Sequence, residues 1–143
     1  MNREIRYRVW CEYEIPGVVD KVFKQMESDA GWFLLTQTGH LMSHGPMGDF
    51  DPNAEKKYRK LVPMLWTGLK DKHGTDIYEG DIIASPHIIE PGAVVQWDER
   101  QGSWSLGEAW PFGEFYGGVE GVQQCEVIGN IYENPDLAKA ASA

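Results

Sequence analysis

The sequence predicts a mainly β protein: a small SH3-like barrel-type sheet with short helices and a C-terminal helix. Three observations support this fold class. Short apolar runs with alternating or β-branched residues recur along the chain, glycine-containing turns separate them, and helical spacing is confined to brief pieces. The length of 143 residues suits one domain, and 42% hydrophobic and 24% charged residues are ordinary for a globular protein. We therefore expect a single domain over residues 1–143.

The first strand is predicted over residues 3–15. Apolar side chains take every second position from Ile5 to Ile15, and charged side chains take most positions between them, which is a period of two. Trp10 interrupts the charged face, and we expect its indole to cover a neighbouring residue. This alternation predicts a half-buried strand near the start of the chain.

The next segment is harder to assign. After a Pro-Gly turn, residues 18–28 combine helical spacing with β-branched residues, so helix and strand both remain open. Residues 31–42 predict a strand, a Thr-Gly turn and a short return strand. Residues 43–53 collect glycine, proline and small polar residues, which predicts a loop. This loop is the candidate boundary between an N-terminal sheet, residues 1–42, and a barrel-like core, residues 61–132.

A short helix is predicted after this loop, because Asn53 is a suitable N-cap and good helix formers follow it. We expect about two turns, ended by Pro63, because proline cannot continue a helix. A strand over residues 64–69 and a turn at residues 73–74 should follow. The helix would thus separate the N-terminal strands from the core.

The C-terminal half reads as a series of strands. Ile82 and Ile83 are expected in a buried strand. Residues 92–107 predict a hairpin in which Gly102 takes a positive φ, and residues 124–132 predict a final core strand.

The chain is expected to end in a helix over residues 134–143. Asn134 is a suitable N-cap, and Pro135 suits the first helical position because the N–H that it lacks has no partner there. The alanine-rich end of this helix should fray.

Composition argues against several classes of protein. The chain has 13 Lys and Arg against 22 Asp and Glu, a net charge of -9 and a pI of about 4.8, which repels phosphate backbones. Cys11 and Cys125 are too few and too far apart for a disulfide framework. We see neither a signal peptide nor an apolar run long enough to span a bilayer. A soluble cytoplasmic protein, with nucleic acid and membranes as improbable partners, is the expectation.

The stretch WTGLKDKHGTDIYEGDII, residues 66–83, contains acids with two interpretations. In the first, Asp76, Glu79 and Asp81 hold Mg²⁺ or act as an acid and base pair in a metal-dependent hydrolase. Their spacing matches neither a Ca²⁺ loop nor a His-based zinc site, so they are weak metal candidates. The other ligand-like group lies in a loop with nothing to orient it: His40 and His44 with Asp49 or Asp51. We expect no metal and no cofactor.

The second interpretation assigns the same stretch to the frame of the barrel. Asp81 is expected to bond to the backbone of a glycine turn, because a short acid can accept from amides exposed at a strand entrance. Glycine supplies the φ freedom that such turns need. This frame comprises Gly68, Gly74, Gly80, Asp81, Gly92 and Gly129. We favour this interpretation, in which the acids hold turns.

Four segments carry a resemblance to a known family: REIRYRVW, LWTGLKDKHGTDIYEGDII, GAVVQW and, above all, EVIGNIYENPDL. They cover about half the chain in collinear order, and the sequence resembles the YopX-like family of phage and prophage proteins. The resemblance implies a phage or prophage origin, a site in the bacterial cytoplasm and homo-oligomers. It carries over no activity and no catalytic residues. The chain departs from the family pattern in residues 16–60 and 107–123, where a function particular to this member would lie.

The function that we expect is non-enzymatic binding to a host or phage protein. The candidate contact is the glycine-rich aromatic loop within residues 107–121, because aromatic side chains are common interface anchors. Its candidate residues are Trp110, Phe112, Phe115 and Tyr116 with Glu108 and Glu114. Capping of the barrel core is an equally good account of these rings. A sharper version is an acidic inhibitor that imitates nucleic acid in the basic groove of a host defence or DNA-processing protein.

Two alternatives belong to other classes. A nucleic-acid-binding barrel could present aromatic and basic side chains to single strands; the candidates are Trp10, Trp97 and Trp104 with Arg6, Arg8 and Arg100. Besides the metal-dependent hydrolase, a thiol enzyme would use Cys11 or Cys125. A catalytic thiolate needs a nearby base and partial exposure, whereas both cysteines fall in predicted strands. We therefore expect both thiols to be buried packing residues.

Overall fold

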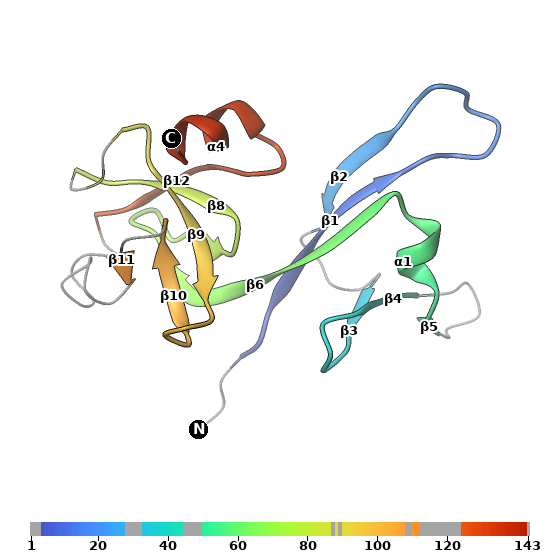
Figure 1. Cartoon of the computed structure of the whole chain (residues 1–143), viewed down its shortest axis with the longest axis horizontal. Coiled ribbons are helices and arrows are strands. Elements are labelled where there is room, and N and C mark those ends of the chain that lie inside the picture. Colours follow the sequence, from blue (N-terminus) through green and yellow to red (C-terminus); the bar gives the residue numbers. More distant parts are fainter. Residues whose placement is uncertain are drawn as a thin grey trace. The chain divides into compact units, whose positions relative to one another are not determined.

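The computed structural model confirms a mainly β chain (Figure 1). It describes residues 4–27, 33–44, 50–86, 88, 90–107, 110–111 and 124–142. Within these ranges, twelve strands and the two short helices α1 and α4 make up the regular structure. The chain divides into two compact units, which we call the N-terminal unit, residues 6–65, and the C-terminal unit, residues 1–5 and 66–143.

The N-terminal unit contains two small antiparallel sheets. In the first, β1 (Tyr7–Tyr13) pairs with β2 (Phe23–Glu27) on one side and with the beginning of β6 (Lys60–Lys70) on the other. The second sheet has three strands in the order β3-β4-β5, which span Phe33–Leu35, Leu41–His44 and Phe50–Asp51. The core of the unit consists of Val9, Cys11, Phe33 and Leu41, with Tyr7, Tyr13, Leu35, Tyr58 and Leu61 packed against it.

The first strand is shorter than its pattern predicts, and it is more deeply buried. Ile5 is 78% exposed and Ile15 is 41% exposed, so the ends of the alternation lie outside β1. Trp10 is only 5% exposed. The indole is thus buried, as expected of a ring that covers neighbours, although it lies on the face that the pattern assigned to charged residues.

The open element at residues 18–28 is a strand. β2 pairs with β1 from Phe23 to Glu27, so hydrogen bonding to a neighbour decides between two local preferences that are nearly equal. The predicted hairpin in residues 31–42 is confirmed as β3 and β4, joined by a turn in which Gly39 has a φ of +84°.

The predicted loop over residues 43–53 needs correction. The described part of it contains the end of β4 and the whole of β5, and Ser43 pairs with Asp51. Residues 45–49 lie outside the described ranges. Glycine and proline therefore mark the connection between two strands. The strand residues in this segment could not be predicted because two to four residues are too few to show the alternation of apolar and polar side chains.

The predicted two-turn helix ended by Pro63 is wrong. Helix α1 is a single turn, Ala54–Lys57, and β6 begins at Lys60 and runs through Pro63. At this point β6 pairs with β1, whereas its pairing with β7 (Asp76–Tyr78) begins only at Trp66. A strand tolerates proline where one of its sides has no ladder to complete, because the missing N–H then costs no hydrogen bond.

The C-terminal unit is built on a five-stranded antiparallel sheet that curls into a half-barrel (Figure 1). The strand order is β11-β10-β9-β8-β12, spanning Trp110–Pro111, Ser103–Leu106, Ala93–Asp98, Asp81–Ala84 and Glu126–Asn130. The second half of β6 pairs with β7 in the same unit. The core of the unit consists of Ile77, Ile83, Val95 and Leu106 from these strands and of Cys125, which directly precedes β12 and lies outside the strand predicted for it.

Most predictions for the C-terminal unit are confirmed. Ile82 and Ile83 are fully buried, and β9 and β10 form the expected hairpin with Gly102 at a φ of +63°. The final strand is β12, and helix α4 spans Pro135–Ala141 with proline in its first turn. The predicted cap is wrong in detail, because the Asn134 side chain makes no capping bond to the helix. Its Oδ1 accepts instead from the amide of Asn130, at 3.1 Å.

Neither α1 nor α4, the helices of the described residues, is long and apolar enough to cross a membrane.

Candidate functional site

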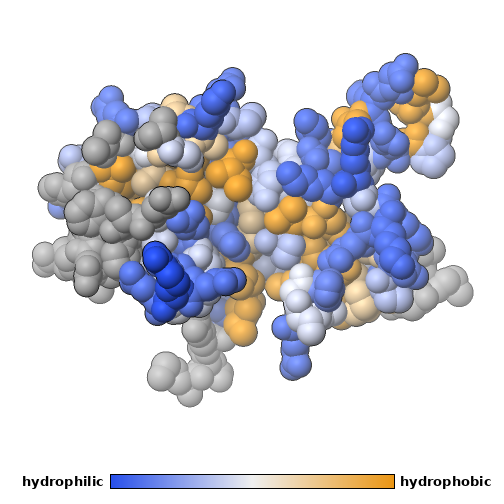
Figure 2. All heavy atoms as spheres, in the orientation of Figure 1, coloured by the Kyte–Doolittle hydropathy of each residue, from blue (hydrophilic) through white to orange (hydrophobic). Residues whose placement is uncertain are grey.

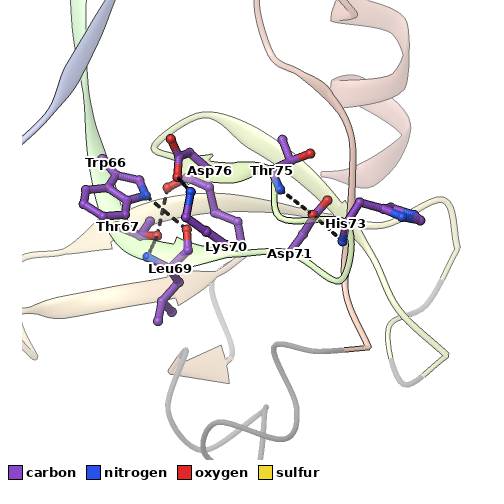
Figure 3. A network of polar contacts seen from close by, with 9 residues as sticks. Trp66, Thr67, Leu69, Lys70, Asp71, His73, Thr75 and Asp76 are labelled. Atoms are coloured by element: carbon purple, nitrogen blue, oxygen red, sulfur yellow. Dashed lines mark hydrogen bonds and ion pairs between the residues drawn. The ribbon is translucent and has the colours of Figure 1, made fainter.

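Asp71 organises the turn between β6 and β7 (Figure 3). Its Oδ1 accepts hydrogen bonds from the amides of His73 and Thr75, both at 2.9 Å. Its Oδ2 accepts from the amide of Val127 in β12, at 3.0 Å. Burial of the carboxyl raises its pKa, but these three hydrogen bonds outweigh the burial, so the net pKa of Asp71 lies below its ordinary value. The carboxylate therefore joins a turn to a strand more than fifty positions away.

The neighbouring part of β6 is irregular, and polar side chains stabilise the irregularity. Gly68 has a φ of +89°, and the register with β7 shifts between Trp66 and Lys70. The Thr67 hydroxyl donates to the Ile77 carbonyl at 2.8 Å and accepts from the Leu69 amide at 3.2 Å (Figure 3). The Thr67 hydroxyl thus binds backbone groups of both strands at this β-bulge or similar irregularity.

The predicted metal candidates do not converge on one point. Asp81 is 1% exposed, and its Oδ2 accepts from the Tyr78 amide at 2.8 Å. Asp76 is half-buried, and the Lys70 ammonium contacts its carboxylate at 2.7 Å. Glu79, in the turn before β8, is half-buried. Within the described residues, no group of three His, Cys, Asp or Glu side chains is arranged to hold a metal ion. The carboxylates of Asp71 and Asp81 both accept hydrogen bonds from backbone amides of turns. The predicted barrel frame includes Asp81 but not Asp71.

The glycines assigned to the frame fall into two kinds. Gly68, Gly74 and Gly80 have φ values of +89°, +80° and +84°, and the turns that they form require this backbone conformation. Gly92 and Gly129 lie against other groups. A Cβ on Gly92 would be 2.6 Å from the Ile83 carbonyl oxygen, and one on Gly129 would be 2.6 Å from Asn134 Oδ1. These two glycines permit close approach, which no local pattern in the sequence indicates.

Among the described residues, the histidines and cysteines predicted as possible metal ligands or nucleophiles do not gather into a metal-binding group. His40 Nδ1 lies 3.2 Å from Glu55 Oε2, and Asp51 pairs with Lys57. The side chain of His44 and all of Asp49 lie outside the described part. Both cysteines are buried, and the two do not form a disulfide.

Burial raises the pKa of the Cys11 thiol to about 12, and the negative charge of Glu27 adds to the effect. Such a thiol stays protonated at neutral pH, so its environment opposes nucleophilic use.

The three tryptophans proposed as a stacking platform do not share one environment. Trp97 and Trp104 form an edge-to-face pair across β9 and β10, with centroids 5.1 Å apart and planes at 75°. Trp97 is 46% exposed, whereas Trp104 packs against the core of the C-terminal unit. Trp10 is buried in the N-terminal unit. At most one indole of the set is substantially open to solvent.

The predicted partner-binding loop lies almost wholly outside the described residues. This applies to Glu108, Phe112, Glu114, Phe115 and Tyr116. Only the backbone of Trp110 is described, in β11, where it pairs with Leu106. The proposed contact role of this loop stays a prediction.

The formal charge is divided unequally between the two units. Residues 6–65 contain eight of the 13 Lys and Arg and eight of the 22 Asp and Glu, so their net charge is zero. The remaining five basic and fourteen acidic residues belong to the C-terminal unit, which therefore carries the whole net charge of -9. The total charge can be counted from the sequence, but its division depends on which segments fold together.

Each unit also has an open groove among its described residues. In the N-terminal unit, a groove of about 520 Å³ lies between the β1–β2 loop and the segment that follows α1. Its lining residues are Glu14, Ile15, Pro16, Val18, Lys56, Lys57, Tyr58 and Arg59. We call it the hairpin groove. Its lining comes from the basic run EKKYRK, residues 55–60, and from the apolar residues around the Pro-Gly turn, and no local pattern in the sequence indicates that these two segments lie together.

The groove of the C-terminal unit, of about 490 Å³, lies beside the segment before β9. It is bordered by Lys72 and Glu126, whose charged atoms are 3.5 Å apart. His73 Nε2 lies 3.4 Å from the other oxygen of the same carboxylate. The Glu126 carboxylate is therefore shared between two basic groups at the surface, and all three side chains are at least 41% exposed.

The fold and its surfaces define a mainly β protein whose acids and glycines stabilise turns. Comparison with known proteins specifies the family: the sequence model described as YopX protein matches residues 6–139. The chain belongs to the YopX family, and the resemblance stated from the sequence is confirmed. No curated protein matches the sequence.

A solved structure supports the same fold. The chain is similar to the crystal structure of protein EF1440 from Enterococcus faecalis, with a TM-score of 0.58 and 22% sequence identity. The match covers 95% of this chain and 99% of the other. At this identity the likeness concerns the fold alone.

Proposed function

We propose that this chain is a non-enzymatic accessory protein of a phage or prophage that binds a host or phage protein through its acidic C-terminal unit. The observation that carries the proposal is the unequal charge: the C-terminal unit has a net charge of -9, whereas the N-terminal unit is neutral. A surface of one sign steers association with a partner of the opposite sign and speeds encounter at low salt.

The acidic side chains available for this contact are spread over several elements. Glu99 is exposed in the β9–β10 turn, and Glu133 and Asp136 are exposed around the start of α4. Asp71 and Asp81, by contrast, are buried and bound to backbone amides. The proposed partner surface is a basic one, such as the nucleic-acid groove of a defence or DNA-processing protein. Homo-oligomers, which the family resemblance implies, are compatible with this role.

The test is affinity capture from a bacterial host lysate with matched charge variants. Glu99→Gln with Glu133→Gln removes two charges from the C-terminal unit, and Glu14→Gln with Asp20→Asn removes two from the N-terminal unit. We expect a stoichiometric partner that survives nuclease treatment, is released by salt, and is lost mainly with the first pair. The proposal would be contradicted if capture required nucleic acid, or if the captured amount changed neither with salt nor with Glu99→Gln and Glu133→Gln.

The nucleic-acid alternative has one favourable observation, the exposed indole of Trp97 beside Trp104. The charge of the same unit opposes it, because phosphate backbones are repelled by a net charge of -9. Titration of tryptophan fluorescence with a single-stranded oligonucleotide at low salt separates the two functions. A quenching that Trp97→Ala removes would favour the nucleic-acid role.

A further inference from the structure

The hairpin groove has two walls that are fixed to the same strand. One wall is the turn at residues 15–18, in which the amide of Val18 donates to the carbonyl of Ile15 at 3.0 Å. Pro16 and Gly17 occupy its central positions, and Gly17 has a φ of +89°, the arrangement of a type II turn. Proline restricts the first central position, so this wall has few alternative conformations.

The opposite wall is the segment that leaves α1. The amide of Arg59 donates to the carbonyl of Glu12 in β1 at 2.8 Å. The ring of Tyr58 lies edge-to-face against Tyr13, with centroids 5.9 Å apart, and against Phe33, with centroids 5.7 Å apart. Both walls are therefore ordered before any partner arrives, which lowers the entropic cost of binding.

The lining combines apolar surface with basic groups. Ile15 and Val18 are 41% and 42% exposed, and Figure 2 shows apolar side chains gathered at the tip of the β1–β2 hairpin. Lys56, Lys57 and Arg59 border the groove, with Glu14 as its single acid. Arg59 lies 3.3 Å from Glu14, and both side chains are more than 60% exposed. Such an exposed pair contributes little stability, so its arginine remains available to a competing carboxylate.

We propose that the hairpin groove binds a peptide segment of a partner protein in which carboxylates alternate with apolar side chains. The apolar side chains would lie against Ile15, Val18 and Tyr58, and the carboxylates would pair with Lys56 and Arg59. A volume of about 520 Å³ is within the range of ligand sites, and the exposed Ile15, Val18 and Arg59 leave the groove open to solvent, which suits a peptide better than an enclosed small molecule. This surface prefers acidic partners, opposite to the preference of the C-terminal unit.

The test uses the full chain and a fluorescein-labelled synthetic peptide in which Glu alternates with Leu and Phe. A second peptide with Lys in place of Glu is the control. Fluorescence anisotropy at low salt should show binding of the acidic peptide and not of the basic one. Absence of binding by the acidic peptide would overturn the proposal.

Matched variants locate the contact. Two double variants change the net charge by the same amount within the N-terminal unit. The first pair is Lys56→Glu with Arg59→Glu, and the second pair is Lys21→Glu with Lys24→Glu. The first pair should weaken peptide binding about tenfold or more and the second less than about twofold, because only the first borders the groove. Val18→Ser should weaken binding, whereas Val19→Ser should not, although Val19 is 82% exposed, because Val18 lines the groove and Val19 does not. Equal effects within either comparison would overturn the proposal.

Two other occupants are distinguished by the same variants. Sedimentation of the unliganded chain would reveal an oligomer that dissociates with Lys56→Glu and Arg59→Glu if a second copy fills the groove. Co-sedimentation with vesicles of anionic lipid, lost with Val19→Ser, would show instead that the hairpin tip enters a membrane surface. Either result would overturn the peptide proposal and identify a second copy of the chain or a membrane surface as the occupant of this region. The variants Glu99→Gln and Glu133→Gln should leave peptide binding unchanged, so this proposal and the proposed function can fail separately.

Discussion

The two units of this protein are stabilised in different ways. The C-terminal unit uses buried carboxylates: Asp71 and Asp81 accept backbone amide hydrogen bonds beside an aliphatic core. The N-terminal unit uses aromatic contacts, with Tyr58 between Tyr13 and Phe33, and it leaves apolar side chains exposed at a hairpin tip. The unit with the larger negative charge thus uses part of that charge for folding. An acid count alone therefore overstates the acidic surface that is available for binding.

The largest expected effect concerns Asp71. Asp71→Ala removes the acceptor of three backbone amides and should lower the free energy of unfolding by about 4 kcal/mol, because charge-assisted hydrogen bonds are lost and partly buried amides lose their acceptor. Denaturant unfolding measures the loss. Lys70→Ala is the control, since the Lys70 side chain is 53% exposed and its ion pair with Asp76 should contribute at most about 0.5 kcal/mol.

Hydrogen exchange with mass spectrometry would show where Asp71→Ala acts. We expect faster exchange in β7, β8 and β12, which the Asp71 turn supports, and unchanged exchange in β1 and β2. If hydrogen exchange in Asp71→Ala became faster to the same extent in both units, Asp71 would not stabilise the C-terminal unit specifically.

Gly92→Ala should have the next largest effect, about 3 kcal/mol, because its Cβ would collide with the Ile83 carbonyl and the backbone φ is +150°. Gly68→Ala provides the comparison. It also has a positive φ, but open space surrounds its Cβ position, so only the backbone strain of about 1 kcal/mol should appear. Similar losses for the two variants would mean that β8 moves to admit the methyl group.

Tyr58→Ala tests the aromatic half of the comparison. Loss of a partly buried ring that contacts Tyr13 and Phe33 should lower the free energy of unfolding by about 2 kcal/mol. Exchange should accelerate in β1, β3 and β4 and stay unchanged in β9 and β10. The opposite distribution would show that stability in the N-terminal unit does not depend on this ring.

The smallest effect is a pH dependence. The folded pKa of Asp71 is lowered, so its stabilisation is present above the unfolded value of 3.8 and is lost as the pH falls through the folded pKa. Asp71→Asn should therefore be less stable than the parent protein at pH 7, and the gap should narrow as the pH falls below 3.8 and through the lowered pKa of the folded state. A constant gap across this range would mean that Asp71 does not titrate with folding.

Local patterns predicted the elements whose signals are local. The β9–β10 hairpin, the strand with Ile82 and Ile83, and helix α4 follow from residue alternation, Gly102 and Pro135, which act within a few positions. The errors occurred where a distant partner decided the outcome. Pro63 was assigned to end a helix, but pairing of β6 with β1, which is far away in sequence, makes that segment a strand.

The candidate surfaces show the same limit. The aromatic loop was selected on composition, whereas the hairpin groove required knowledge that Arg59 bonds to Glu12 across more than forty positions. The role of Asp81 in its turn was predictable, because the amide that it accepts from is three residues away. The bond from Val127 to Asp71 was not predictable, because no nearby residue signals it.

The sequence by itself determined the net charge of -9, the mainly β character, the turns that need glycine and the YopX family resemblance. Only the tertiary structure decided that this charge belongs entirely to one unit, that Asp71 joins a turn to β12, and that a basic run and an apolar turn face each other across a groove. The physical reason is range. Propensity and turn chemistry act between neighbours, whereas charge distribution, close backbone approach and groove formation depend on which distant segments pack together.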